Sequence, residues 1–287
     1  LTSDSVEPSR LGLFVGAGTA VGRTEDLLPA IREATTDEVF DTGAFGAEGL
    51  HRINPLWLLK GLSNNILGFA SGDLNAQGPN QNYCNSGVSG LQAIGEAAWS
   101  LIEGTAYVLI AGSADSAVNP LHFTGFGRLR ALTSKLGPEA VRPFDVQHCG
   151  FAPSEGSAFV VLERESHVKA RGRKPLAYIA GYSNGCAGHA LGSGDVDTVA
   201  LGWETCLKNA GWALDDVDLI YAHGNGTVRF DNIEAAALRK VFGNKQPPVT
   251  TNKGQIGHTI AAGGPISIAC AIAAMQAGRI PHIAHLN

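Results

Sequence analysis

Short apolar runs alternate with helical segments along this chain, and this alternation restricts it to folds in which helices cover parallel sheets. A first series of expected strands and helices comprises residues 10–18, 55–71, 88–102, 107–111, 158–163 and 165–171. A second series comprises residues 176–182, 197–210, 219–223, 231–242, 249–252 and 265–277. Because the alternation of strands and helices begins again in the second series, the sequence predicts an α/β protein built from two similar halves, residues 1–164 and residues 165–287.

Composition supports a packed α/β chain and argues against several kinds of partner. Hydrophobic residues make up 44% of the 287 residues and charged residues 16%, which is typical of a globular protein with much buried surface. The 37 glycines suit many tight turns between strands and helices. A net charge of −5 without a Lys/Arg stripe argues against a nucleic-acid partner. The apolar run at residues 256–277 contains His258 and Pro265, so we expect a buried helix and no membrane span.

The cysteines predict free thiols in a reducing compartment, and hence a cytoplasmic protein. The five of them are scattered and form no CxxC pair: Cys84, Cys149, Cys186, Cys206 and Cys270. The CAGH sequence from Cys186 to His189 offers only half of a metal site. We therefore predict no metal.

Two glycine-bearing loops place imidazoles where predicted strands end. AHGNGTVRFDNIE, residues 222–234, puts His223 directly after an apolar strand and ahead of a helix. TNKGQIGHTIAAGG, residues 251–264, puts Lys253 and His258 in a similar loop. The carboxyl ends of parallel strands are where α/β proteins place their ligands, so both loops are candidate site segments.

Several motifs in one order resemble the β-ketoacyl synthases of the thiolase superfamily. HGNGT with Asp231 and Glu234 matches the family pattern HGTGTxxxDxxE, and NKGQIGH matches NKxxxGH. FDVQHCGFAPSEG, residues 144–156, matches FDxxRDGFxxGEG. GFGRLRAL and AGSADSAVNP also fit, so the resemblance extends over residues 10–287.

The resemblance implies a thiolase-like fold with two stacked βαβαβ-type halves in αβαβα layers, here shortened at both ends. Family members dimerise through the strand before the nucleophile, and they need no cofactor. A cysteine at a helix N-terminus accepts an acyl group from an acyl carrier protein, and two histidines assist decarboxylative condensation. By position these histidines are His223 and His258. Lys253 matches the lysine that pairs with the acidic residue at Glu234, and Phe151 matches a phenylalanine that gates the acyl pocket.

The nucleophile itself does not match. The family places it nine residues after the glycine of a Gly-Pro pair, and counting from Gly78 reaches Gly87. The family also places it seven residues before an apolar helix position, and counting back from Ile94 reaches Gly87 again. Cys84 lies three residues too early. In a strand this shift amounts to about 10 Å and turns the side chain to the opposite face.

The residues around Gly87 leave other readings open. The run Asn80, Gln81, Asn82 replaces an apolar family strand, and its amides need polar partners in another subunit or in a polar pocket. Ser86 and Ser89 flank Gly87, and helix capping is their expected role, with a serine nucleophile as the alternative.

We therefore expect a chain-length-factor-type subunit of a type II polyketide or fatty acid synthase. Such a subunit forms a heterodimer with a catalytic ketosynthase, shapes the acyl tunnel and meets the acyl carrier protein. One alternative is an active β-ketoacyl synthase that uses Cys84 with His223 and His258. Another is a decarboxylase of malonyl carrier protein that works through the two histidines without a thiol.

Overall fold

The computed structural model describes residues 6–18, 24–188 and 194–287. Its larger sheet has the strand order β4-β1-β5-β6. The central strand β1 (Leu11–Gly16) lies parallel to both β4 (Asn80–Tyr83) and β5 (Val108–Ser116). β6 (Glu155–Glu163) pairs antiparallel with β5. Every residue of β1 is buried, as the apolar run predicted.

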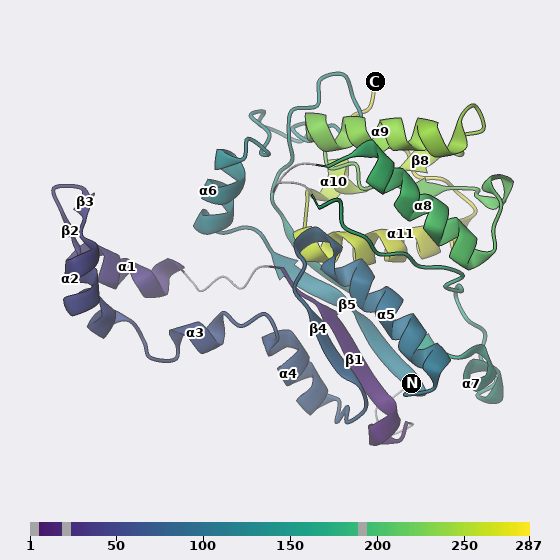
Figure 1. Cartoon of the computed structure of the whole chain (residues 1–287), viewed down its shortest axis with the longest axis horizontal. Helices are drawn as coiled ribbons and strands as arrows, with labels where there is room; N and C mark the ends of the chain where they lie inside the picture. The colour runs from purple at the N-terminus through teal and green to yellow at the C-terminus, as the bar shows by residue number, and fades with distance from the viewer. Residues whose placement is uncertain (1–5, 19–23, 189–193) are drawn as a thin grey trace.

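Helices cover both faces of this sheet because β1 is apolar on both sides. Phe14 packs with apolar residues of α5 (Ser89–Glu103), whereas Leu13 and Val15 pack toward α4 (Asn65–Asp73). Alternate side chains of a strand point to opposite faces, so α4 and α5 lie on opposite sides of the sheet. α11 (Gly263–Ala277) packs against α5 and β6. Figure 1 shows α11 beside this layer.

The second half of the chain forms a smaller sheet. β7 (Ile220–Tyr221) pairs in parallel with β8 (Val249–Thr250). α8 (Val196–Ala210) and α9 (Val228–Phe242) pack against each other above α11 in Figure 1. Two shorter helices belong to this half, α7 (Glu165–Ala170) and α10 (Lys253–Ile256). The helix α6 (Pro120–Arg128) belongs to the first half and follows β5.

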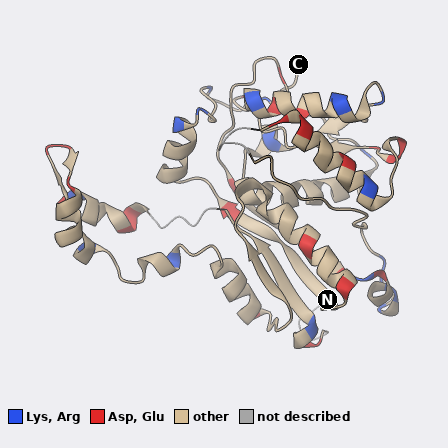
Figure 2. Cartoon of the chain, viewed as in Figure 1, with Lys and Arg blue, Asp and Glu red and all other residues tan. Residues whose placement is uncertain are grey.

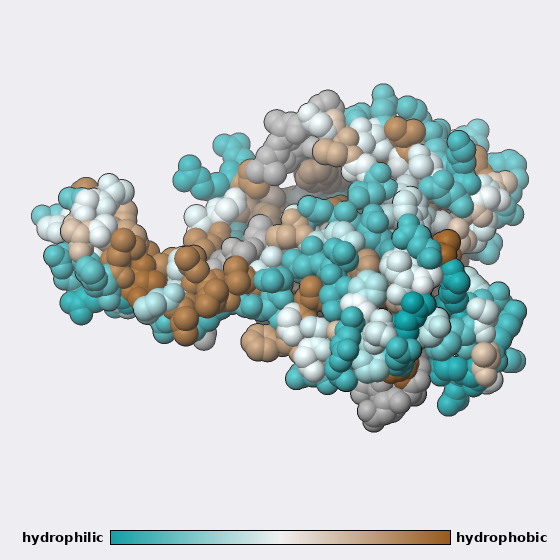
Figure 3. Space-filling model, turned by 60° about the horizontal axis from the view of Figure 1, so that its bottom comes forward, coloured by the Kyte–Doolittle hydropathy of each residue, from teal (hydrophilic) through white to brown (hydrophobic). Residues whose placement is uncertain are grey.

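An arm formed by residues 24–60 projects from the body (Figure 1). Its elements are α1 (Thr24–Glu33), the hairpin strands β2 (Thr35–Thr36) and β3 (Val39–Phe40), α2 (Thr42–Ala47), the 3-10 helix Gly49–Arg52 and α3 (Trp57–Lys60). Apolar side chains stay exposed along it and form the brown band in Figure 3, among them Val39, Phe40, Leu50, Leu56, Leu58 and Leu59. The sequence patterns did not predict this arm.

Two predicted elements differ from the structure. The helix expected at residues 55–71 is broken into α3 and α4, because the side-chain Nδ2 of Asn65 donates to the carbonyls of Leu59 and Lys60 and ends α3. The strand expected at residues 176–182 is not formed. There the Tyr182 carbonyl accepts from Asn209 Nδ2 of α8.

One apolar helical stretch bears on the prediction that the chain has no membrane span. Among the described residues, Ile260–Ala277 has the length and composition of a span, and 33% of it is buried. The stretch packs on α5 and β6, but the helix expected to be buried is buried only in part.

A contact between two glycines fixes the start of α5 against β1. A Cβ atom at Gly16 would lie 2.4 Å from the backbone nitrogen of Gly90, and a Cβ at Gly90 would lie 2.5 Å from the carbonyl oxygen of Ala261. The first turn of α5 therefore lies directly between β1 and the loop before α11. Neither position has room for a side chain.

We predict that Gly16→Ala lowers the free energy of unfolding by about 1–3 kcal/mol, because the added methyl group forces β1 and α5 apart. Urea unfolding followed by circular dichroism would measure this. Gly125→Ala in α6 is the matched control, since nothing lies within 4 Å of its Cβ position. An equal loss in both variants would contradict the close contact.

Candidate active site

The HGNGT loop is held by a carboxylate of the helix that follows it. His223 comes two residues after β7, and the loop turns through Gly224 and Gly226, with φ of +38° and +87°. The Glu234 carboxylate accepts the backbone N–H groups of His223 at 2.7 Å and Gly224 at 2.8 Å. These bonds fix the backbone from which the His223 ring projects.

Asp231 joins the same loop to the FDVQHCGF segment. Its side chain is 1% exposed and accepts the backbone N–H of Gly226 at 3.1 Å and of Phe144 at 2.8 Å. His148 Nδ1 lies 3.2 Å from the same carboxylate. Phe144 has a φ of +60°, a conformation that costs energy for a bulky side chain and that the bond to Asp231 helps to hold. The two acidic residues of the motif therefore act on backbone geometry.

Backbone hydrogen bonds to residues 152–154 hold His258 in place. Its N–H donates to the Ala152 carbonyl at 2.9 Å, and the Ser154 N–H donates to the His258 carbonyl at 3.1 Å. Gly257 precedes it with a φ of +74°, and a Cβ there would lie 2.8 Å from the Ala152 oxygen. Only glycine suits this position.

The rings of three predicted site residues form a continuous row of edge-to-face contacts. The ring centroids of His223 and His258 lie 5.2 Å apart at 83°, and those of Phe151 and His258 lie 5.0 Å apart at 86°. Phe126 of α6 packs edge-on against Phe151 at 5.1 Å. Both histidines therefore meet at one place although 35 residues separate them, and Phe151 covers one side of His258.

Both imidazoles are held neutral at physiological pH. Burial and the nearby Lys253 cation lower the pKa of His258 to about 3. The same two causes, with His258 as a third, lower the pKa of His223 well below its ordinary value. His258 is 6% exposed and its Nδ1 has no hydrogen-bond partner among the described residues, whereas the surface of His223 is exposed to solvent, so the lowered pKa is the firmer conclusion for His258. Burial and a neighbouring cation both disfavour the protonated imidazole, so they act in the same direction.

Lys253 supplies the charge that acts on both histidines. Its side chain is 3% exposed, and burial lowers its pKa to about 8, although Glu234 and Asp231 partly oppose this shift. Burial also raises the pKa of Glu234. The described residues include no ion pair between Lys253 and Glu234 within 4 Å, because the Glu234 carboxylate is engaged by the loop N–H groups.

Gly87 and Cys84 occupy different surroundings. Gly87 lies in the 3-10 turn Ser86–Val88 directly before α5, and a Cβ there would meet only the Ile260 carbonyl oxygen, at 4.0 Å. Ile260 follows His258 by two residues. Cys84 lies one residue past β4, is exposed, and its thiol donates to the Gly18 carbonyl at 2.8 Å. Of the two, Gly87 therefore lies at the start of the helix, beside the His258 loop.

The serines and the amides near Gly87 are mostly engaged locally. Ser89 Oγ donates to the Ser86 carbonyl at 2.8 Å and accepts the Asn85 N–H at 2.7 Å, so it bridges the turn before α5. The expected helix-capping role of Ser86 and Ser89 is not formed, because the N-cap of α5 is Val88 and no side chain caps the helix. In β4, Asn80 Oδ1 accepts the Leu13 N–H, while its Nδ2 donates to the Ala76 carbonyl. The exposed Gln81 side chain has no hydrogen bond among the described residues.

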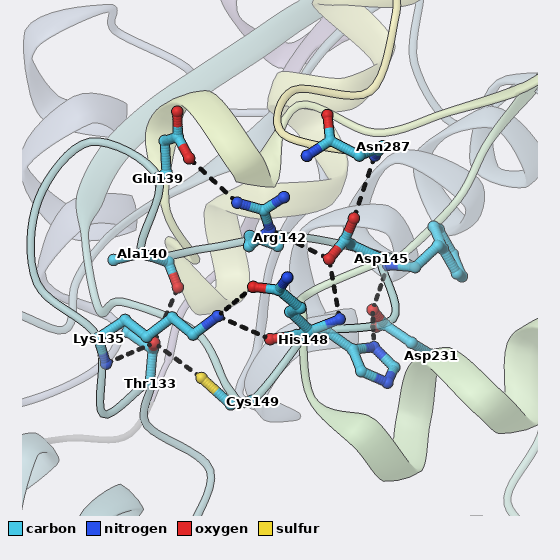
Figure 4. Close-up of polar contacts among 12 residues, drawn as sticks. Thr133, Lys135, Glu139, Ala140, Arg142, Asp145, His148, Cys149, Asp231 and Asn287 are labelled. Atoms are coloured by element: carbon cyan, nitrogen blue, oxygen red, sulfur yellow. Dashed lines mark hydrogen bonds and ion pairs between the residues drawn. The ribbon is translucent and has the colours of Figure 1, made fainter.

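Sequence reasoning missed the polar network that surrounds the loop (Figure 4). Arg142 Nε donates to the buried carboxylate of Asp145 at 3.1 Å, and the N–H of Asn287 reaches the other Asp145 oxygen at 3.1 Å. Backbone N–H groups and Arg142 hold the pKa of Asp145 at about 2. The FD of the motif was visible, but its partners lie 3 and 142 residues away, beyond any local pattern.

The structure describes all five cysteines but only one of the two residues of the expected half metal site. All five cysteines are free, as predicted. Cys186 is described and exposed, whereas His189 lies outside the described residues. Residues 6–18, 24–188 and 194–287 contain no group of three or more His, Cys, Asp or Glu arranged to hold a metal ion.

Comparison with known families decides the wider assignment. Residues 1–168 match the family "Beta-ketoacyl synthase, N-terminal domain", and residues 176–287 match "Beta-ketoacyl synthase, C-terminal domain". The chain belongs to the beta-ketoacyl synthase family. The resemblance inferred from the motifs is thereby confirmed, while the boundary predicted at residue 164 stays a prediction.

Curated beta-ketoacyl synthases are similar to this chain over nearly its whole length. The mitochondrial 3-oxoacyl-acyl-carrier-protein synthase of Arabidopsis thaliana is 30% identical, over 98% of this chain and 60% of that protein. The actinorhodin polyketide beta-ketoacyl synthase 1 of Streptomyces coelicolor is 32% identical, over 100% of this chain and 61% of that protein. The chain thus spans about 60% of the length of these relatives.

Solved structures of ketosynthases share the fold. The ishigamide ketosynthase/chain length factor matches with a TM-score of 0.81 at 25% identity, over 98% of this chain and 66% of that chain. A complex of a type II polyketide synthase acyl-carrier protein with its ketosynthase matches with a TM-score of 0.85 at 24% identity, over 96% and 67%. The predicted thiolase-like α/β fold is confirmed.

We predict that His258 makes the protein sensitive to acid. Its folded pKa of about 3 lies below the ordinary 6.5, so between these values the unfolded chain binds a proton that the folded chain does not. Stability falls as pH drops through this window, by at most about 1.4 kcal/mol per pH unit for this one group. Urea unfolding at a series of pH values measures the free energy of unfolding as a function of pH. Between pH 6.5 and pH 3 this free energy should depend less steeply on pH in His258→Gln than in the wild type. An unchanged slope would show that His258 takes up its proton in the folded state.

Proposed function

We propose that this chain is a ketosynthase-like subunit that carries no acyl group itself and pairs with a catalytic ketosynthase. In this chain-length-factor-type role it would help to shape the acyl tunnel of a type II polyketide or fatty acid synthase. Its five free thiols fit the cytoplasm, where we place it.

The observation that carries the proposal is the glycine at the start of α5. Helix N-termini lower thiol pKa values and are where a nucleophilic cysteine would be activated. Gly87 lies there beside the His258 loop and has no side chain to react, while the surrounding space is open. Cys84 lies beyond the end of β4, with its thiol directed to a carbonyl oxygen.

Two surfaces support pairing with another chain. β4 is the edge strand of its sheet, so one side of its backbone is available to a strand of a partner. The exposed apolar side chains of the arm would lose water against a partner, which favours association. The ishigamide ketosynthase/chain length factor and the ketosynthase bound to its acyl-carrier protein are similar in fold, and we propose a ketosynthase and a carrier protein as partners here.

Intact mass spectrometry tests the proposal directly. The purified chain, incubated with octanoyl carrier protein, should gain no acyl group, whereas Gly87→Cys should gain one, because the site has room for the side chain. A catalytic ketosynthase co-expressed with the tagged chain should co-purify with it in a 1:1 ratio.

Cys84→Ala is the matched control for the thiol. It should behave as the wild type in both measurements. An acyl adduct on the wild-type chain that disappears in Cys84→Ala would overturn the proposal in favour of an active β-ketoacyl synthase using Cys84.

A second candidate function is decarboxylation of malonyl carrier protein, favoured by the paired neutral imidazoles of His223 and His258. In this reaction the bond between the carboxylate and the α-carbon breaks, carbon dioxide leaves, and the electron pair passes to the thioester enolate, which takes a proton from water. Neutral imidazole N–H groups can donate to the developing enolate oxygen. Lys253 adds positive charge nearby.

We expect any such activity to depend on both rings. Carbon dioxide release from malonyl carrier protein by the purified chain would be measured, with His223→Ala and His258→Ala as paired variants. Loss of one hydrogen-bond donor should slow release by about 100-fold or more. No release by the wild type would exclude this function and leave the non-catalytic subunit.

A further inference from the structure

A notch of about 290 Å³ lies between the edge strand β4 and the helix α5. It combines aromatic rings with carboxylates, and its lining residues are Phe14, Gln81, Tyr83, Glu96, Trp99, Ser100 and Glu103. Trp99 is 52% exposed, and its ring meets the edge of the Tyr182 ring at 6.1 Å. Because β4 and α5 both line it, the notch opens beside the free edge of the sheet.

The carboxylates of the notch have no cation as a partner among the described residues. Glu96 accepts only a long hydrogen bond of 3.4 Å from the Tyr182 hydroxyl, and no ion pair involves Glu96 or Glu103. The nearby Arg10 and Arg164 instead donate to backbone carbonyls at the C-terminal end of α5. The acidic residues of α5 are visible as red segments in Figure 2; Glu103 is exposed and Glu96 is half-buried.

Aromatic faces together with carboxylates are the chemistry that recognises a lysine or arginine side chain. The carboxylates provide charge-assisted hydrogen bonds, and rings such as Trp99 and Tyr83 attract a cation over their faces. Burial and the charge of Glu96 raise the pKa of both Tyr83 and Tyr182, which is consistent with a carboxylate close to both rings. A basic side chain would satisfy all of these groups at once.

A second copy of this chain that paired symmetrically through β4 would bring carboxylates to the notch and not a cation. An antiparallel pair of β4 edges would place the two α5 helices side by side about a two-fold axis, because a symmetric dimer uses the same surface twice. Glu96 lies seven residues from Ser89 and seven from Glu103, at the middle of α5. The Glu96 and Glu103 carboxylates of both copies would then lie in one interface, and like charges repel.

We propose that the notch receives a lysine or arginine side chain from a different protein chain, and that Glu96 and Glu103 disfavour pairing of this chain with itself. The inference deepens the proposed function, since it rests on a partner at the β4 edge. It gives that partner a stated chemistry: a basic residue near the middle of the helix that faces α5.

Charge exchange within this chain tests the inference without a known partner. Sedimentation velocity would be run on the full chain as the wild type, as E96Q/E103Q, as E96K/E103K and as an equimolar mixture of wild type and E96K/E103K. We expect the neutral variant to self-associate at least tenfold more tightly than the wild type. The mixture should form a 1:1 complex at least tenfold tighter than either component alone, and added salt should weaken it.

Glu204→Lys on the exposed side of α8 is the control for charge alone, and it should not associate with the wild type. Glu103→Lys, at the exposed end of α5, is a milder substitute if E96K/E103K does not fold. Self-association of the wild type as tight as that of E96Q/E103Q would overturn the inference, and so would a mixture no tighter than its components. If charge exchange works but no ketosynthase co-purifies, the notch chemistry stands and the proposed function fails. If a ketosynthase co-purifies but charge exchange has no effect, the proposed function stands and Glu96 and Glu103 do not select the partner.

Discussion

Two buried carboxylates on one turn of α9 hold the candidate site together. Glu234 accepts the N–H groups of His223 and Gly224, and Asp231 accepts those of Gly226 and Phe144. A buried carboxylate without such donors would cost several kcal/mol, roughly as any unpaired buried charge does. The loop and the helix therefore depend on each other, and the position of the His223 ring follows from them.

The same arrangement separates the frame of the site from its chemistry. The frame consists of backbone hydrogen bonds and close glycine contacts, such as Gly16 against Gly90, and a Cβ at position 87 would disturb none of these contacts. The chemistry needs side chains, and at Gly87 there is none. The family fold with both histidines in contact is therefore formed without a reactive side chain at position 87.

Local patterns in the sequence predicted what depends on local structure. The apolar run of β1, α5 with its end at Gly104, and the position of His223 after β7 all follow from short segments. The expected loop position of Lys253 and His258 was wrong in part, because Lys253 begins α10 and this helix lies between β8 and His258. The irregular path of residues 176–182 and the break after α3 could not be predicted, because side chains of Asn209 and Asn65 take over backbone groups there. The meeting of the two histidine rings required the family resemblance, since 35 residues separate them and no period connects them.

The amides of β4 have a consequence for the chain before it meets any partner. An open sheet edge is a template on which other strands can add without limit, and β-branched or aromatic residues would favour that growth. Asn80 and Asn82 instead turn their side chains back to Ala76 and Ser63, and Gln81 stays solvated. Asparagine is a poor strand former, so β4 is less stable as a strand than an apolar one would be, and the same property makes its open edge a weaker template for aggregation.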